Sequence, residues 1–269
     1  MLVYAIDALR KHFHGRVIVA DDSFEISDSV ITELSNLDVE LHRIGPDIGL
    51  SAGRNFLLQQ VKSEKFLLMD SDFVLRDSNG IDKLQIVMEE TDAAIVGGLL
   101  WDKGSHEPRN YCGYFDLEDG EIVVNLYDIP SLVKKSVDQV TYYGCRICQN
   151  FFLGNTEKFK RHNLHWNEEF KLMEHEDFFI RIPSFLKVFE TPDVHVVHYP
   201  ILEYMDIIPD YEGFRGVKMD ETYSGHRHAP SHRSKVAKHY GLKGEFFQTE
   251  WGHNIDWTNG FPSFRRIKI

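Results

Sequence analysis

Two aspartates, one residue apart, interrupt an apolar run in the first third of the chain. Residues 66–75 read FLLMDSDFVL, and Asp70 and Asp72 stand where a buried strand would end. Ionised carboxylates this close repel each other, and burying either is costly unless a cation or hydrogen-bond donors compensate the charge. A metal ion would do so; alternatively, Asp70 closes a turn and Asp72 caps a helix. The stretch alone fits both interpretations.

Three other groups of polar residues have types suited to binding or catalysis. Asp21 and Asp22 end the run RVIVADD, Glu176 and Asp177 lie in EHEDFFIRI, and His198 lies in DVHVVHYP. Each group also has a structural interpretation: a turn after a strand, acids in the first turn of a helix, and a histidine with a purely structural partner. The positions of these residues on the predicted helices and strands are therefore needed to choose between the two interpretations.

Apolar spacing predicts helices and short buried strands in alternation over the first hundred residues. Ser51 is the expected N-cap of the third helix. The expected helices are 2–13, 28–37, 51–62 and 79–90, and the expected strands are 16–22, 39–44, 65–69 and 93–100. This rhythm favours a parallel or mostly parallel sheet with helices on both faces.

Polar or small residues follow the predicted strands at their carboxyl ends. They are Asp21, Asp22, Asp70, Asp72, Gly97 and Gly98. In open α/β sheets ligands bind in the crevice beyond these strand ends, whereas turn and capping acids would be scattered over both edges. The convergence favours a binding site over a structural role.

Beyond residue 104 the pattern is looser. It becomes regular again at CQNFFLGN (148–155), at a helix from Thr156, at 174–182 and at a last strand, 193–200, before a tail rich in His and Arg. No repeat or low-complexity linker divides the chain, so we expect one domain whose second half forms an acceptor surface.

Composition limits the classes of partner. The 269 residues carry a formal net charge of −12, which argues against nucleic acid as the main partner and leaves room for a local basic pocket for a small anion. Cys112, Cys145 and Cys148 are too few for a disulfide framework and are expected to be small buried residues. No apolar run is long enough to span a bilayer, so we expect a soluble chain.

The order of the motifs resembles the GT-A class of nucleotide-sugar glycosyltransferases, family 2 in particular. The similarity is strongest to the inverting β-1,4-N-acetylgalactosaminyltransferases related to ganglioside GM2/GD2 synthase. It lies in VADDS (19–23), GLSAGRN (49–55), MDSDF (69–73), VGG (96–98), NFFLGNTEKF (150–159), EHEDFF (174–179) and DVHVVH (193–198). Each motif alone is weak, but their shared order over residues 2–200 is fairly specific.

The resemblance implies a fold and a division of the chain. The expected GT-A fold is Rossmann-like, with a mostly parallel central sheet and helices on both faces. The family opens with a strand before the first helix, whereas this sequence starts directly at that helix. Three interpretations are open: the strand comes from residues outside the given sequence, it is replaced by another segment, or nucleotide affinity is weak. Residues 1–100 would bind nucleotide, 101–200 would form the acceptor and catalytic half, and 201–269 would form a C-terminal lid and tail.

The resemblance also implies a metal site. A divalent cation would bind the diphosphate of a UDP-sugar, with Asp72 as the most direct ligand, Asp70 also reaching the ribose, and His198 completing the set. Mixed carboxylate and imidazole ligands suit Mn²⁺, with Mg²⁺ as the alternative. On an extended segment the two aspartates would point toward the same ion.

The remaining roles follow from the same resemblance. Asp177 is the expected general base, which takes the proton from the acceptor hydroxyl, and Glu176 is its fallback. The expected contacts to the nucleotide-sugar come from Asp21, Asp22, Arg54, Asp70, Gly97, Gly98 and Arg227, the last from a lid over the diphosphate.

The implied activity is transfer of a hexose or N-acetylhexosamine from a UDP-sugar to a hydroxyl of a glycolipid, glycoprotein or polysaccharide. The compartment is left open between the cytoplasm and, with an N-terminal anchor, the Golgi lumen. Three alternatives remain: a retaining transferase of similar fold, an inactive sugar-nucleotide-binding protein, and a metal-dependent phosphohydrolase using the same acids.

Overall fold

The structure is a computed structural model of the 269-residue chain. It describes residues 1–104, 108–109, 111–118, 121–126, 134–170, 174–199 and 265–268. Most of the predicted C-terminal lid, including Arg227, lies outside the described residues.

The N-terminal part alternates helices with two parallel strands, as predicted. Its elements are α1 (Leu2–Arg10), β1 (Val17–Asp21), α2 (Asp28–Asn36), β2 (Val39–Arg43) and α3 (Leu50–Gln60). The N-cap of α3 is Gly49, at φ 92°, and not Ser51 as predicted. The Ser51 hydroxyl is buried and donates a hydrogen bond to the carbonyl of Phe170 (2.6 Å).

The larger sheet is mixed and mostly antiparallel, so the prediction of a mostly parallel sheet is wrong. Its order is β3-β10-β5-β11-β9-β8, with β4 paired to β11, and only β5 and β11 run parallel. Its strands are β3 (Lys65–Met69), β4 (Phe73–Leu75), β5 (Ile95–Asp102), β8 (Lys135–Val137), β9 (Val140–Cys145), β10 (Phe151–Asn155) and β11 (Val188–His198). β10 inserts between β3 and β5 and runs antiparallel to both, and β4 and β9 run antiparallel to β11.

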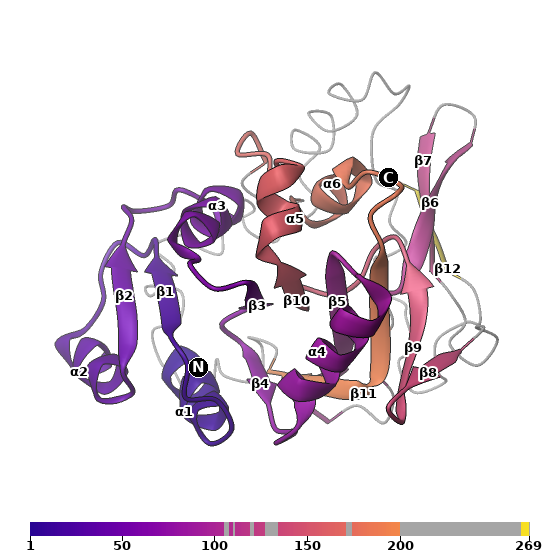
Figure 1. Ribbon diagram of the computed structural model, residues 1–269. Coiled ribbons are helices and arrows are strands. Elements are labelled where there is room, and N and C mark those ends of the chain that lie inside the picture. The colour runs from indigo at the N-terminus through magenta and orange to yellow at the C-terminus, as the bar shows by residue number, and fades with distance from the viewer. Residues whose placement is uncertain are drawn as a thin grey trace.

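The β1–β2 pair forms its own sheet beside the larger one (Figure 1). Within the described residues, no strand pairs with the second edge of β1 or with the outer edge of β3. None of the five residues of β1 is buried, although the sequence predicts a buried strand.

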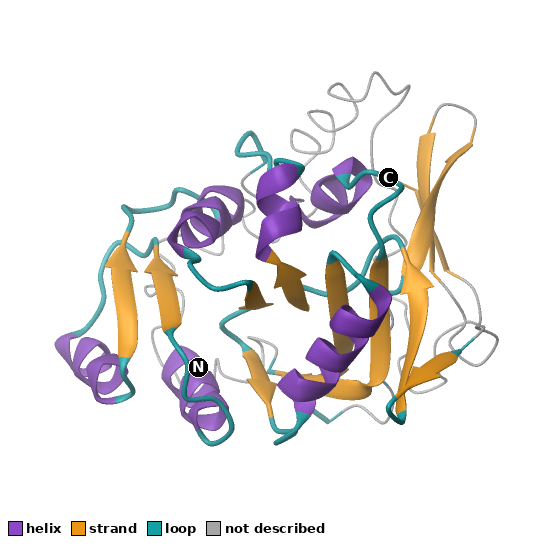
Figure 2. Ribbon diagram, in the orientation of Figure 1, coloured by secondary structure: helices purple, strands orange, loops and turns teal. Residues whose placement is uncertain are grey.

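Two large clusters of buried apolar side chains form the core. Figure 2 shows the helices and strands of the chain in the orientation of Figure 1. α4 (Gly80–Thr91) packs on β5, β10 and β11, whereas α5 (Thr156–Arg161) and α6 (Glu174–Arg181) bring aromatic side chains together with those of β10. Trp166 is 1% exposed and stacks on Phe178, with ring centroids 4.4 Å apart. The three cysteines are buried, as expected.

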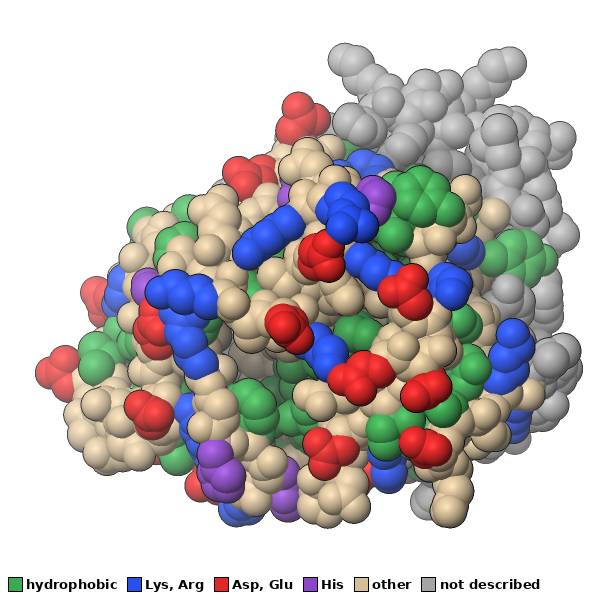
Figure 3. Space-filling view, in the orientation of Figure 1, with side chains coloured by type: hydrophobic (Ala, Val, Ile, Leu, Met, Phe, Trp, Pro, Cys, Tyr) green, Lys and Arg blue, Asp and Glu red, His purple; other side chains and the backbone are tan. Residues whose placement is uncertain are grey.

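A small third sheet pairs β6 (Gly113–Glu118), β7 (Glu121–Leu126) and β12 (Arg265–Lys268). Within the described part of the chain, no helix has the length and apolarity to cross a bilayer. On the face drawn in Figure 3, acidic and basic side chains of the described residues are interspersed, which differs from the continuous basic surface that binds nucleic acid.

Candidate active site

The Asp70–Asp72 segment is a tight turn between β3 and β4. The amide of Phe73 donates to the carbonyl of Asp70 (3.1 Å), and the amide of Tyr199 donates to the carbonyl of Asp72 (3.0 Å). The extended geometry expected for this segment is therefore wrong. The turn leaves both carboxylates partly exposed, with 32% of the Asp70 side chain and 27% of the Asp72 side chain accessible.

Strand pairing places His198 beside Asp72. In the antiparallel β4–β11 ladder His198 lies opposite Phe73, the residue after Asp72. The Phe73 ring holds the imidazole edge-on, with centroids 5.5 Å apart. His198 Nε2 lies 3.4 Å from Asp72 Oδ2. The structure thus brings together two of the three predicted metal ligands, which stand 126 positions apart in the sequence numbering (198 against 72).

A carboxylate that the sequence analysis missed holds the other side of this imidazole. Asp102 lies opposite His198 in the parallel β5–β11 ladder, and its Oδ1 is 2.5 Å from His198 Nδ1. Arg109 donates from Nε (2.9 Å) and lies with Nη2 2.6 Å from the other oxygen, Oδ2. Burial raises the pKa of Asp102, but the bonds from His198 and Arg109 outweigh it and lower the pKa overall.

The same contacts set the charge of His198. Burial alone would lower its pKa, but hydrogen bonds to Asp102 and Asp72 outweigh burial and raise the pKa to about 9. In the absence of a metal ion, a protonated imidazole therefore compensates Asp72.

A second cation compensates Asp70. Arg54, on α3, donates from Nη2 to Asp70 Oδ1 (2.8 Å) and from Nη1 to Glu174. The Arg54 side chain is 6% exposed and lies over the Trp166 ring, 5.8 Å from its centroid. Burial raises the pKa of Asp70 more than Arg54 lowers it. The sequence analysis missed Glu174, although it lies in the same EHEDFF motif as the predicted base.

Helix α6 carries the predicted base. Because Glu174 is joined to Asp70 through Arg54, the start of α6 lies next to the aspartate turn. Glu176 is partly exposed, whereas Asp177 is 1% exposed and accepts from Arg181 Nε (2.9 Å). The structure therefore places the helix as expected and holds the Asp177 carboxylate in a buried ion pair.

The predicted nucleotide-sugar residues lie in two surroundings. Asp21 accepts from the Ser23 hydroxyl (2.7 Å) and pairs with Arg43, and Asp22 accepts from the Gly49 amide (3.1 Å). Both aspartates lie, partly exposed, at the carboxyl end of β1, as predicted.

Gly97 and Gly98 lie inside β5. A Cβ on Gly97 would meet Cys148 Sγ at 2.8 Å, and one on Gly98 would meet Phe151 Cε1 at 2.7 Å. Their lack of side chains thus has a packing reason that the sequence did not reveal.

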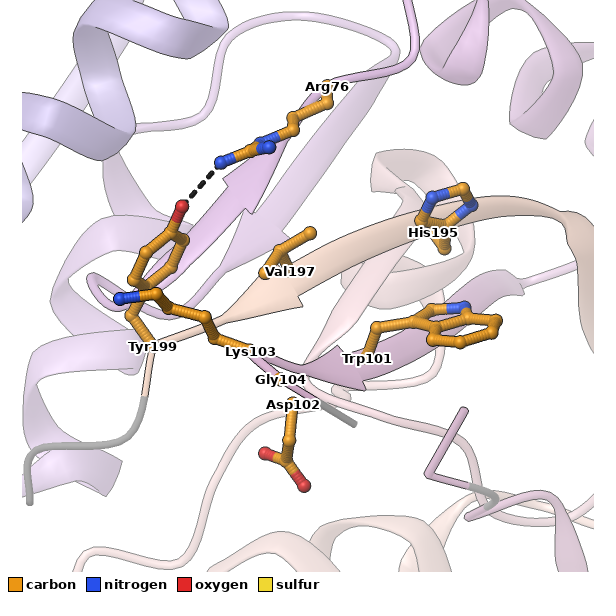
Figure 4. A pocket seen from close by; sticks show the side chains of 8 residues that line it. All are labelled: Arg76, Trp101, Asp102, Lys103, Gly104, His195, Val197 and Tyr199. Atoms are coloured by element: carbon orange, nitrogen blue, oxygen red, sulfur yellow. Dashed lines mark hydrogen bonds between the residues drawn. The ribbon is translucent and has the colours of Figure 1, made fainter. Parts of the chain in front are cut away.

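A pocket lies on the other face of the β5–β11 pair. It has a volume of about 430 Å³, and Arg76, Trp101, Lys103, His195 and Tyr199 are among its lining residues. Figure 4 shows these side chains grouped together while the Asp102 carboxylate points away from them. Side-chain alternation explains the separation, because Trp101 and Val197 face one side of the sheet and Asp102 and His198 the other.

The donor set fits a cation that also binds a ligand. In the described part of the chain, no three His, Cys, Asp or Glu side chains are close enough to form a metal cage. Asp72 and His198 offer one carboxylate and one imidazole, and Mn²⁺ or Mg²⁺ commonly takes its remaining ligands from water and phosphate oxygens.

Comparisons with known proteins support the resemblance to β-1,4-N-acetylgalactosaminyltransferases. The chain is 28% identical over 210 residues to β-1,4 N-acetylgalactosaminyltransferase 2 of Mus musculus (72% of this chain, 36% of the relative). It is 27% identical over 228 residues to β-1,4 N-acetylgalactosaminyltransferase 1 of the same organism (83% and 40%). The chain thus spans about two fifths of the length of these curated relatives. No protein-family model matches it.

Solved structures support the fold. The S. aureus TarS 1–349 structure in complex with UDP-GlcNAc matches with a TM-score of 0.51 and 13% identity, over 74% of this chain and 55% of TarS. The UDP complex of TarS matches with a TM-score of 0.50 and 14% identity, over 90% and 68%.

Proposed function

The chain is distantly homologous to β-1,4-N-acetylgalactosaminyltransferases and shares the α/β fold of TarS, and on this basis we propose that it is an inverting, metal-dependent glycosyltransferase. It moves N-acetylgalactosamine, or a related hexose or N-acetylhexosamine, from a UDP-sugar to a hydroxyl of a glycan. The observation that carries the proposal is the pairing of Asp72 with His198 at the turn between β3 and β4.

The cation is the proposed partner of this pair. Asp72 Oδ2 and His198 Nε2 would hold it, with Asp70 as a neighbouring acid. When bound to the diphosphate, Mn²⁺ or Mg²⁺ stabilises the negative charge that develops on the leaving group. The protein's own contribution is to hold the carboxylate and the imidazole at a fixed spacing by the β4–β11 ladder.

The donor would bind at the strand ends beside this pair. Asp21 and Asp22 contact the uracil or ribose, and Arg227 contacts the diphosphate. Arg54 supports the site by holding Asp70, a role that its buried ion pairs favour over a direct contact with the nucleotide. Gly97 and Gly98 shape the strand beneath the sugar.

Asp177 is the proposed general base. An inverting transfer needs a carboxylate that accepts the proton of the acceptor hydroxyl as that oxygen attacks the anomeric carbon. Arg181 pairs with Asp177 and the carboxylate is buried, so the acceptor hydroxyl must reach it in a buried setting. Glu176, partly exposed on the preceding position, is the alternative base.

The test is release of UDP from a panel of UDP-sugars with Mn²⁺, with and without glycan acceptors. The wild-type protein should release UDP, and Asp72→Asn should lose Mn²⁺-dependent UDP binding and turnover. Asp82→Asn, an exposed carboxylate on α4, is the matched control and should behave like the wild type. UDP binding without turnover would instead identify an inactive binding protein, and phosphate release from simple nucleotides would identify a phosphohydrolase.

A second measurement tests the mechanism. NMR of the first product should show an inverted anomeric configuration; retention would identify a retaining transferase. Asp177→Asn should spare UDP binding and lower transfer by about 10²–10⁴-fold, the usual contribution of a general base. Near-normal turnover of this variant, with loss of turnover in Glu176→Gln, would move the role to Glu176.

A further inference from the structure

We propose that Asp102, clamped by Arg109, is the positioning residue that keeps His198 Nε2 directed at the cation. The inference rests on the proposed function in that it concerns the proposed metal site. It adds two residues, Asp102 and Arg109, that the sequence motifs do not include.

The backbone fixes the contact between Asp102 and His198. The two residues are partners in the parallel β5–β11 ladder, so their side chains leave the sheet on the same face. The amide of Lys103 donates to the carbonyl of His198 (2.8 Å), which extends the ladder past Asp102. The short side chain of Asp102 therefore reaches the imidazole directly, with Oδ1 2.5 Å from His198 Nδ1.

Arg109 fixes the carboxylate itself. Its guanidinium engages Asp102 Oδ2 through two nitrogens, which leaves Oδ1 for the imidazole. Arg109 is in turn held by its backbone, because its amide donates to the carbonyl of Leu100 (2.6 Å) and its carbonyl accepts from Gln149 (3.4 Å). Both carboxylate oxygens of Asp102 are thus engaged, Oδ1 by His198 and Oδ2 by Arg109.

The consequence concerns the two ring nitrogens of His198. A histidine that ligates a metal commonly donates its other N–H to a carboxylate, which fixes the ring orientation and the tautomer. Here the Nδ1–H donates to Asp102, and Nε2 faces Asp72. Without Asp102, the ring could rotate or carry its proton on Nε2. Either change would prevent the lone pair of Nε2 from binding the cation.

The test compares Asp102→Ala and Asp102→Asn with the wild type. Titration calorimetry with Mn²⁺ and UDP measures the affinity for the metal. Asp102→Ala should weaken Mn²⁺ binding by about 10–100-fold, as loss of such carboxylates does elsewhere. Asp102→Asn retains an oxygen that accepts from Nδ1–H and should lose less. His195→Ala, on the opposite face of β11, is the matched histidine control and should keep wild-type affinity.

A metal-free readout separates this proposal from the proposed function. NMR should detect a His198 Nδ1–H proton protected from exchange in the wild type and in His195→Ala, and its loss in Asp102→Ala. Unchanged Mn²⁺ affinity in a folded Asp102→Ala overturns the proposal. If the wild type binds no Mn²⁺, the proposed metal site fails, and the NMR signal alone decides: its persistence in Asp102→Ala overturns the positioning role, and its loss supports it.

Discussion

At the scale of residues, the candidate site is built from paired charges. Asp70 is compensated by Arg54, Asp72 by His198, and Asp102 by both His198 and Arg109. The sequence motifs indicated Asp70, Asp72 and His198 because their types and spacing match a known pattern. The motifs could not indicate Asp102, which lies outside them, or the pairing of Glu174 with Arg54, since both depend on which strands and helices become neighbours.

Arg54 should be one of the most costly residues to remove. Its side chain is 6% exposed and its guanidinium pairs with two carboxylates, so Arg54→Ala leaves Asp70 and Glu174 without this counter-ion. We expect a loss of about 3–5 kcal/mol in the free energy of unfolding, measured by urea denaturation. Arg161→Ala removes an exposed pair with Glu157 and should cost less than about 1 kcal/mol. Equal losses in the two variants would contradict a buried, coupled triad.

Glu190 is a buried acid outside the proposed site. It is fully buried on β11, and Tyr143 donates a hydrogen bond to its Oε1 (2.9 Å). Burial raises the pKa of Glu190 from 4.5 to about 8, although the Tyr143 bond acts in the opposite direction. The native protein therefore holds a proton here that the unfolded chain releases between these two pH values.

This shift predicts a pH-dependent effect of Glu190→Gln. The stabilising contribution of protonated Glu190 is present below about pH 4.5 and is lost as the pH rises through about 8. The advantage of Gln over Glu in the free energy of unfolding should grow from pH 5 to pH 9, by on the order of 3–5 kcal/mol. Urea denaturation at both pH values measures it, and a difference that does not change with pH would refute the assignment.

At the scale of elements, most strands and helices of the first hundred residues could be predicted, whereas β4 and the antiparallel pairing of the larger sheet could not. Residues 65–69 form β3 with the predicted bounds. The NFFLGN segment forms β10, which inserts antiparallel between β3 and β5. A short apolar run fits a buried strand of either direction, because side-chain periodicity carries no information on the partner strand.

Close packing of β5 explains why residue 98 is a glycine, whereas the sequence analysis expected Gly98 to contact the nucleotide-sugar. A Cβ on Gly98 would meet Phe151 Cε1 at 2.7 Å and the carbonyl oxygen of Val194 at 2.8 Å. Gly98→Ala should therefore lower the free energy of unfolding by about 1–3 kcal/mol. Gly53→Ala is the matched control, because Gly53 lies within helix α3 and a Cβ there would be 3.7 Å from Ile44, an ordinary contact. This substitution should raise the free energy of unfolding by about 0.5–1 kcal/mol. Thermal denaturation that ranks the two in the opposite order would rule out the packing explanation.

At the scale of the whole molecule, the sequence supported the class of fold because motifs from distant segments occur in a fixed order. The chain spans about two fifths of the curated relatives, and its β1–β2 pair stands apart from the larger sheet within the described residues. The separation of the sheets could not be predicted, since it depends on a strand pairing and not on local pattern. The β4–β11 ladder of the larger sheet brings Asp72 and His198 together, so their pairing does not depend on the separation of the two sheets.

The central claim is that Asp72 and His198 hold a cation together with the diphosphate of UDP. The most direct measurement is a crystal structure of the full chain with Mn²⁺ and UDP, with the anomalous signal of manganese used to locate the ion. We expect one ion bonded to Asp72, to His198 Nε2 and to diphosphate oxygens, with Asp102 still on His198 Nδ1. Bound UDP with no ion contacting Asp72 or His198 would contradict the account.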